Sequence, residues 1–151
     1  MRAVIQRVRK AKVIVNNKTV SEIGKGLLVF LGIGKEDNEK DFEYISRKLT
    51  GLRIFEDENS KFNLSLTDIN GEILIVSQFT LYGDCRKGRR PSFDQAETVE
   101  NSLIIYNNFL KYFKKNYSNI PIKEGVFQAH MEVELINDGP VTFLLDSKKI
   151  F

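Results

Sequence analysis

Polar side chains follow directly on an apolar run near the middle of this chain. The run from Ile73 to Val76 is aliphatic and mostly β-branched, which predicts a buried strand with both faces covered. Without a turn signal, the run is followed by Ser77, Gln78, Phe79 and Thr80. A hydroxyl or amide group buried without a partner costs about 1–3 kcal/mol, so these groups either bond to neighbouring backbone or face a ligand. The end of this strand is therefore the first candidate site.

Ser77 and Thr80 carry the hydroxyl groups that could act as nucleophiles at this strand end. A serine or threonine nucleophile requires a base within reach and a third group that orients the base. The sequence contains no G-x-S-x-G elbow, and its single histidine, His130, is predicted to lie on the polar face of a strand. An esterase driven by a side-chain nucleophile such as Thr80 is therefore disfavoured, although it stays open as an alternative.

The signatures of metal and nucleotide sites are incomplete. His130 and Cys85 are the only imidazole and thiol groups. The segment His130-Met131-Glu132 resembles half of the zinc-deaminase signature, but the P-C-x-x-C half is absent. Gly32 and Gly34 end an apolar run without the third glycine of a dinucleotide-binding loop. We therefore expect no metal and no cofactor.

A second candidate site is a cluster of cations, made up of Arg86, Lys87, Arg89 and Arg90. Pro91 and Phe93 follow the cluster. Clustered cations suit contacts with the phosphates of a nucleic acid. Runs of charge are also typical of solvated loops, and the sequence alone leaves both interpretations open.

Bulk composition sets the broad class. The 151 residues are 42% hydrophobic and 28% charged, which predicts one globular domain over residues 1–151. The net charge of +3 permits an anionic partner without requiring one. Cys85 is the only cysteine, so the chain cannot form an internal disulfide. The N-terminal residues lack the apolar core of a signal peptide, and the longest apolar run, Leu27 to Ile33, is too short to cross a membrane. We therefore expect a cytoplasmic protein without a membrane segment.

Hydrophobic periodicity then predicts the elements that position these residues. A turn is expected at Asn16-Asn17 and another at Asn137–Pro140, because asparagine, aspartate and glycine favour turns. Strands are expected at Ala3–Val8, Lys12–Val15, Thr19–Ile23, Leu27–Gly34, Leu52–Phe55, Ile73–Leu81, Met131–Leu135 and Val141–Leu145.

Two amphipathic helices complete the prediction. One begins at Asn38 and has an apolar stripe of Phe42, Ile45, Leu49 and Leu52. The other runs from about Thr98 to Asn116, with a core-facing side of Leu103, Tyr106, Leu110, Phe113 and Tyr117. Many strands with only two helices favour an antiparallel α+β architecture over alternating βαβ units.

Four segments together resemble one family, the D-aminoacyl-tRNA deacylases. They occur in the family's order, and the similarity spans essentially all 151 residues. The segments are Met1 to Val8, Ser77 to Leu81, Gly88 to Phe93 and Asn137 to Thr142. The resemblance implies a barrel-like α+β fold and a cytoplasmic homodimer that hydrolyses the ester between a D-amino acid, or glycine mischarged on tRNA(Ala), and the 3′-terminal ribose of tRNA.

The resemblance also implies roles for individual residues. Gly139 and Pro140 would form a cis peptide that one subunit inserts into the active site of the other, held in place by Arg7. The segment from Ser77 to Thr80 would line the pocket for the aminoacyl group and the terminal adenosine. Further pocket wall would come from Ala129 and Met131.

Physical reasoning is compatible with this mechanism. An aminoacyl ester is already activated, so backbone N–H groups around Phe79 and Thr80 could suffice as oxyanion donors, with help from the ribose 2′-hydroxyl. A rigid backbone wall could exclude L side chains. Two further alternatives stay open. One is a non-catalytic nucleic-acid-binding module that uses the loop from Arg86 to Arg90, and the other is a structural dimer hooked together by Asn137–Pro140.

Overall fold

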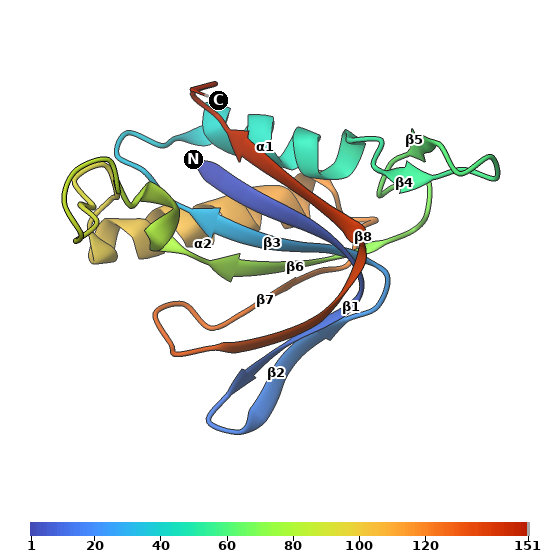
Figure 1. Ribbon diagram of the computed structural model, residues 1–151, viewed down its shortest axis with the longest axis horizontal. Helices are drawn as coiled ribbons and strands as arrows, with labels where there is room; N and C mark the ends of the chain where they lie inside the picture. The colour runs from blue at the N-terminus through green and yellow to red at the C-terminus, as the bar shows by residue number, and fades with distance from the viewer. Residues whose placement is uncertain (151) are drawn as a thin grey trace.

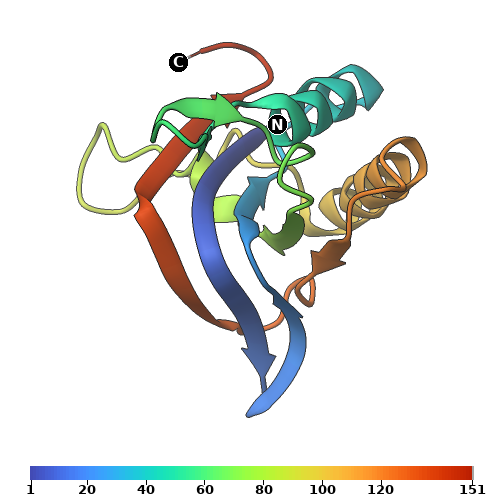
Figure 2. The same ribbon diagram turned by 90° about the vertical axis from the view of Figure 1, so that its right-hand side faces the viewer.

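One long N-terminal strand runs through the middle of the main sheet. The computed structural model describes residues 1–150, and in it β1 (Arg2–Val15) pairs along one edge with β3 (Gly26–Gly32) and then with β2 (Lys18–Ile23). Along its other edge β1 pairs with β8 (Glu132–Asp146). The six-stranded sheet is completed by β6 (Glu72–Ser77) and β7 (Ile122–Glu124), and a small second sheet joins β4 (Phe55–Glu56) to β5 (Phe62–Leu64). Figures 1 and 2 show β1 and β8 curving together into a partial barrel.

Successive side chains along the central strands point to opposite faces of the sheet, and they form two separate hydrophobic clusters. Leu27 and Val29 of β3 face one cluster, whereas Leu28 between them faces the other. The larger cluster also takes in both helices, α1 (Glu39–Gly51) and α2 (Val99–Asn116), which therefore cover one face of the sheet (Figure 2). The smaller cluster lies on the opposite, concave face.

Each helix begins at the predicted residue. Asn38 caps α1 with a complete capping box, in which its side chain accepts from the helix backbone and Asp41 accepts from the Asn38 N–H at 2.8 Å. The Thr98 side chain caps α2 by accepting from the Asn101 N–H, without a reciprocal bond from the third helical residue. The expected apolar face of α2 is correct at Tyr106, Leu110 and Phe113.

Leu103 does not belong to that face. It is 41% exposed, and the buried positions of α2 are instead Ser102 and Phe109, together with the three residues already named. Phe109 belongs to the larger hydrophobic cluster and packs edge-on against Phe42 of α1, with ring centroids 5.7 Å apart. Helical periodicity also allows positions 102, 106, 109 and 113 on one side, and the tertiary contacts select this set.

The expected α+β fold with a barrel-like sheet and two main helices is confirmed, although not every pairing is antiparallel. β3 pairs with β6 in parallel, and β6 pairs with β7 in parallel. Parallel neighbours need a long crossover connection, and α1 and α2 lie in these two connections.

Several expected boundaries were wrong. The segments Ala3–Val8 and Lys12–Val15 form one strand, β1, and the strand expected to continue to Leu81 ends at Ser77. The expected turn at Asn137–Pro140 is absent, because β8 continues through it. In place of a turn, the β1–β8 ladder shifts register on either side of Val8, and Gly139 adopts a φ of +137°. The strand expected at Leu52–Phe55 begins only at Phe55.

A buried ion pair fixes the N-terminal end of β1. The α-ammonium group of Met1 pairs with Asp37, and it also donates to the Ser147 hydroxyl at 2.7 Å. The second carboxylate oxygen of Asp37 accepts from the Gly34 N–H at 2.7 Å. Burial raises the pKa of Asp37, an effect that the ammonium group opposes. The pair therefore ties the start of β1 to the loop that leads into α1.

No helix within residues 1–150 is long and apolar enough to cross a membrane.

Phe109→Ala tests whether α2 is held by its packing against the sheet. We expect it to lower the free energy of unfolding by about 3–5 kcal/mol, because the side chain is fully buried. Ile104→Ala on the same helix is the matched control, since Ile104 is 58% exposed, and we expect a change within about 0.5 kcal/mol. Urea denaturation at one protein concentration measures both. Equal effects in the two variants would contradict this assignment of the core.

Candidate active site

A cleft of about 460 Å³ opens beside the end of β6. Ser77, Gln78 and Phe79 contribute one side of it, and Ala129 and Met131 contribute another. These five predicted residues are therefore brought together from segments that lie far apart in the sequence. The cleft is also lined by residues that the sequence did not indicate, including Phe30, Glu97, Val99, Ser102, Phe127, Gln128 and Val133.

The chain leaves the sheet sharply at this cleft. The Gln78 N–H makes the last ladder bond, to the Leu31 carbonyl at 2.8 Å, and the 3₁₀ helix η1 (Phe79–Tyr82) follows at once. The first N–H groups of any helix lack acceptors within the helix, and no side chain caps η1. The N–H groups of Phe79 and Thr80 can therefore bind an oxyanion beside the cleft.

No nucleophile–base pair is formed at this turn. The Thr80 hydroxyl accepts from the Gln78 side-chain amide at 2.5 Å, and within residues 1–150 no imidazole or carboxylate bonds to Thr80 or Ser77. Thr80 is exposed beside the cleft rather than part of its lining. The site therefore offers backbone donors and a shaped surface, but its hydroxyl groups have no base to activate them.

Arg2 and Tyr82, which sequence analysis did not single out, hold η1 against the sheet. Arg2 donates from Nη1 to the Leu81 carbonyl at 3.0 Å and from Nε to Asp146 at 2.9 Å. Its guanidinium group lies 4.5 Å from the centroid of the Tyr82 ring. Burial, together with the nearby carboxylates of Asp37 and Asp146, raises the pKa of Tyr82, so its phenol is neutral at physiological pH.

Gly139 and Pro140 lie on the exposed part of β8, and neither lines the cleft of its own chain. The bond between them is cis. Arg7, which is 4% exposed, donates from Nε to the Asp138 carbonyl at 2.8 Å. It also donates from Nη1 to the Ile54 carbonyl at 2.7 Å, so the segment beside Gly139 is attached to the connection between α1 and β4.

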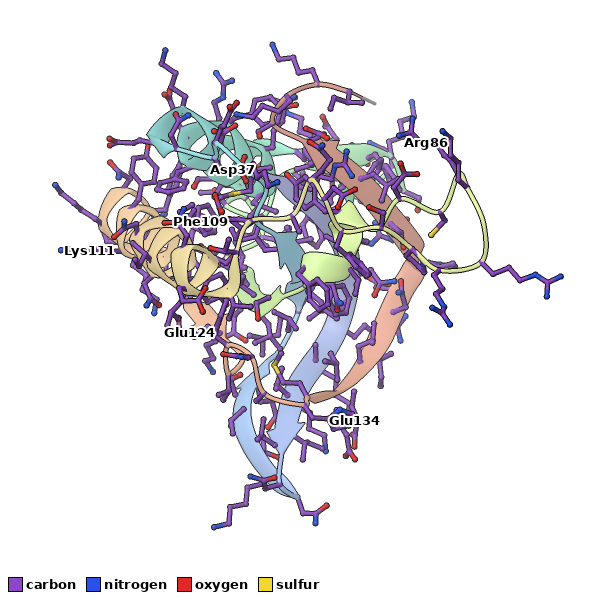
Figure 3. The ribbon with its side chains drawn as sticks, turned by 90° about the vertical axis from the view of Figure 1, so that its left-hand side faces the viewer. Asp37, Arg86, Phe109, Lys111, Glu124 and Glu134 are labelled. Atoms are coloured by element: carbon purple, nitrogen blue, oxygen red, sulfur yellow. The ribbon has the colours of Figure 1, made fainter. Side chains whose placement is uncertain are left out.

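The four predicted cations differ in their surroundings. Arg86 makes a two-pronged ion pair with Asp84, with distances of 2.9 and 2.6 Å, and its hydrogen bonds lower the pKa of Asp84 to about 2. Lys87, Arg89 and Arg90 are exposed, and no carboxylate within residues 1–150 lies within 4 Å of them. Figure 3 shows Arg86 on the loop that projects from the body of the protein.

His130 lines the cleft as an exposed side chain, and Cys85 is exposed on the projecting loop. Within residues 1–150, no group of three or more histidine, cysteine, aspartate or glutamate side chains could hold a metal ion.

Comparison with known proteins identifies the family. Residues 4–146 match the sequence profile of the family described as D-Tyr-tRNA(Tyr) deacylase. The D-aminoacyl-tRNA deacylases of Thermosipho africanus and Thermotoga petrophila are 60% and 56% identical to this chain over 151 residues, which is 100% of each protein. The chain therefore belongs to the D-Tyr-tRNA(Tyr) deacylase family, a family of ester hydrolases, and the resemblance stated from its motifs is confirmed.

Two solved structures share the fold. The c-Myc DNA unwinding element binding protein is 46% identical, with a TM-score of 0.91 over 97% of this chain and 98% of that one. A probable eukaryotic D-amino acid tRNA deacylase is 20% identical, with a TM-score of 0.76 over 95% and 97% of the two chains.

Gly139→Ala tests the backbone strain at the Arg7-held segment. An added Cβ would lie 2.6 Å from Val141 Cγ2 on a residue whose φ is +137°, so we expect the free energy of unfolding to fall by about 1–3 kcal/mol or more. Gly51→Ala at the end of α1 is the control, because a Cβ there meets nothing within 4 Å. We expect Gly51→Ala to be neutral or stabilising by up to about 1 kcal/mol. Thermal unfolding of both variants measures the difference, and a neutral Gly139→Ala would show that the segment is not strained.

Proposed function

We propose that residues 1–151 act as one cytoplasmic domain that hydrolyses the ester between a D-amino acid, or glycine, and the 3′-terminal ribose of tRNA, including glycine mischarged on tRNA(Ala). The observation that carries this proposal is the uncapped start of η1 beside the cleft, in a chain of the deacylase family. An ester hydrolase without a nucleophile–base pair needs a substrate that is already reactive, and an aminoacyl ester is such a substrate.

The proposed reaction is attack of water on the ester carbonyl. The carbonyl oxygen binds to the N–H groups of Phe79 and Thr80, which stabilise the negative charge that develops on it. The ribose 2′-hydroxyl positions the attacking water and helps to take up its proton. The C–O bond to the 3′-oxygen then breaks, and the products are the free amino acid and tRNA with its 3′-hydroxyl restored. Ser77 and Gln78 orient the ester, and the Gln78 amide fixes the Thr80 hydroxyl.

The remaining cleft residues provide the wall for the terminal adenosine. Ala129 and Met131 line the cleft together with Phe127 and Phe30, so the surface is largely apolar. A cavity of about 460 Å³ lies within the ordinary range of ligand pockets, and apolar walls with a few polar groups are typical of them.

A second copy of the chain completes the proposed site. Strand β8 leaves large apolar groups uncovered, since Leu144 is 60% and Ile136 46% exposed. Gly139 and Pro140 are exposed but lie outside their own cleft. We therefore infer a homodimer in which each Gly139-Pro140 segment enters the partner's cleft. There its backbone would leave space for hydrogen, but not for a side chain, at the position that an L-residue fills.

The first experiment follows deacylation of D-tyrosyl-, L-tyrosyl- and glycyl-tRNA in the presence of EDTA. We expect rapid loss of the D-tyrosyl and glycyl esters and survival of the L-tyrosyl ester. The reason is that the Gly139-Pro140 backbone would exclude a side chain at the α-carbon position that an L-residue fills. Cleavage of all three esters would refute exclusion of L-residues by the wall.

Two further results of this assay address the alternatives. Thr80→Ala should keep substantial activity, and a complete loss of turnover would favour the nucleophile mechanism. Survival of all three esters would favour the nucleic-acid-binding module. That alternative is supported by the exposed cations Lys87, Arg89 and Arg90 and by the name of the 46% identical solved structure, which describes a DNA-element binding protein.

Mixed dimers test the exchange of segments between subunits. Gly139→Ala impairs only the inserted segment, whereas Ala129→Trp fills only the cleft. A mixed dimer of the two variants has one intact site, which combines the cleft of one subunit with the segment of the other. We expect each variant alone to be inactive and random mixing to restore about a quarter of wild-type turnover, since half of the dimers are mixed and each has one working site of two. Mixed dimers can be isolated with a different affinity tag on each variant. If these isolated dimers recover no deacylase turnover, the exchange of Gly139-Pro140 segments between subunits is excluded.

A further inference from the structure

Two phenylalanine rings meet at the mouth of the cleft and remain open to solvent. Phe79 is 59% exposed and Phe93 is 36% exposed, although their ring centroids are only 5.0 Å apart, at an interplanar angle of 56°. Phe79 also lines the cleft, whereas Phe93 lies beyond it. The pair therefore extends an aromatic surface outward from the place where the terminal adenosine would bind.

The backbone holds Phe93 in this position. Ser92 and Asp84 exchange two backbone hydrogen bonds of 3.0 and 2.7 Å, which close the base of the projecting loop. The Phe93 carbonyl accepts from the Ala96 N–H at 2.9 Å. A Cβ at Gly83 would lie 3.1 Å from Phe93 Cε1, so the ring packs closely over Gly83. The ring is fixed before any ligand binds, which lowers the entropic cost of stacking on it.

The loop between the two rings carries unpaired positive charge. Lys87, Arg89 and Arg90 are exposed, and within residues 1–150 no carboxylate lies within 4 Å of them. Exposed aromatic rings beside a cationic strip are the arrangement that binds single-stranded nucleic acid, because the rings stack on bases and the cations follow the phosphates. The loop itself favours an anionic occupant over a second copy of this chain, whose net charge is +3.

We propose that the Phe79–Phe93 pair is a stacking subsite for the base of the nucleotide that precedes the terminal adenosine, with the cations of the loop on the adjoining phosphates. The identity of this nucleotide rests on the proposed function, because a tRNA whose terminal adenosine lies in the cleft must continue past its mouth. Phe93 is thus a binding residue for the unpaired end of the tRNA, and it takes no part in breaking the ester.

The test pairs a protein change with a substrate change. Phe93→Leu removes the aromatic ring but keeps an apolar side chain, and a D-aminoacyl-tRNA with an abasic penultimate nucleotide removes the stacking base. On intact tRNA, we expect Phe93→Leu to raise KM about tenfold with kcat unchanged, within the range measured for base–aromatic stacking. On the abasic substrate, wild type and Phe93→Leu should be equal. Phe93→Trp should restore the wild-type KM, and Ile104→Ala, an exposed apolar residue elsewhere, should not change it.

Three results would overturn the subsite. The first is an equal loss on intact and abasic substrates, which would make Phe93 only a support for η1. The second is a shift of Phe93→Leu from dimer to monomer in sedimentation, which would make the pair a subunit contact. The third result uses the wild-type enzyme alone and does not depend on whether a variant folds. It is an equal KM of the wild-type enzyme for intact and abasic substrates.

Binding separates this inference from the proposed function. The affinity of a short single strand ending in C-C-A is measured by fluorescence anisotropy for wild type and Phe93→Leu. If wild type cleaves no ester but binds the strand about tenfold more tightly than Phe93→Leu does, the proposed reaction fails and the stacking subsite stands. If wild type cleaves the esters and the two proteins bind the strand equally, the reaction stands and the subsite fails.

Discussion

Two guanidinium groups on a single strand hold both parts of the candidate site. Arg2 and Arg7 are on β1, and their odd separation directs them to opposite faces of the sheet. Arg2 bonds to the Leu81 carbonyl in η1, and Arg7 bonds to the Asp138 carbonyl in β8. A carbonyl buried without a donor costs about 1–3 kcal/mol, so each bond constrains the segment that it holds. Strand β1 pairs with β8 along nearly its whole length. The geometry of the site therefore depends on how these two strands are aligned.

A site built from restrained backbone suits the chemistry of an aminoacyl ester. Such a substrate needs orientation and charge stabilisation more than it needs an activated side chain. One oxyanion donor is worth roughly 10²–10³ in kcat in enzymes where it has been removed, and the first turn of η1 offers the N–H groups of Phe79 and Thr80. Backbone also serves discrimination well, because it cannot rotate away from a side chain that it excludes. The same rigidity therefore supports both catalysis and selection between D- and L-residues in the proposed mechanism.

Local signals in the sequence predicted the local structure correctly. Asn16-Asn17 adopts positive φ in the turn between β1 and β2, and Asn38 caps α1. Errors arose where a distant partner decides the conformation. The segment Asn137–Pro140 has the composition of a turn, yet pairing of Asn137 and Thr142 with β1 on either side of it carries β8 through the segment. Phe109 and Arg2 were missed for the same reason, since their importance comes from α1 and η1, which are remote in sequence. The cleft residues at the end of β6 were found because a polar strand end is itself a local signal.

In the proposed mechanism, the arrangement of charge and aromatic rings would let one small site serve many tRNAs. Asp84 pairs with Arg86 at the base of the loop, whereas Lys87, Arg89 and Arg90 are exposed and have no carboxylate within 4 Å in residues 1–150. Phosphate contacts and stacking on rings carry little sequence information, because every nucleotide has a phosphate and every base has a π-face. Recognition that begins at the unpaired end of the tRNA and finishes at the α-carbon of the amino acid would ignore both the tRNA body and the amino-acid side chain. The enzyme would then be selective for chirality alone, which is the property that proofreading of D-residues requires.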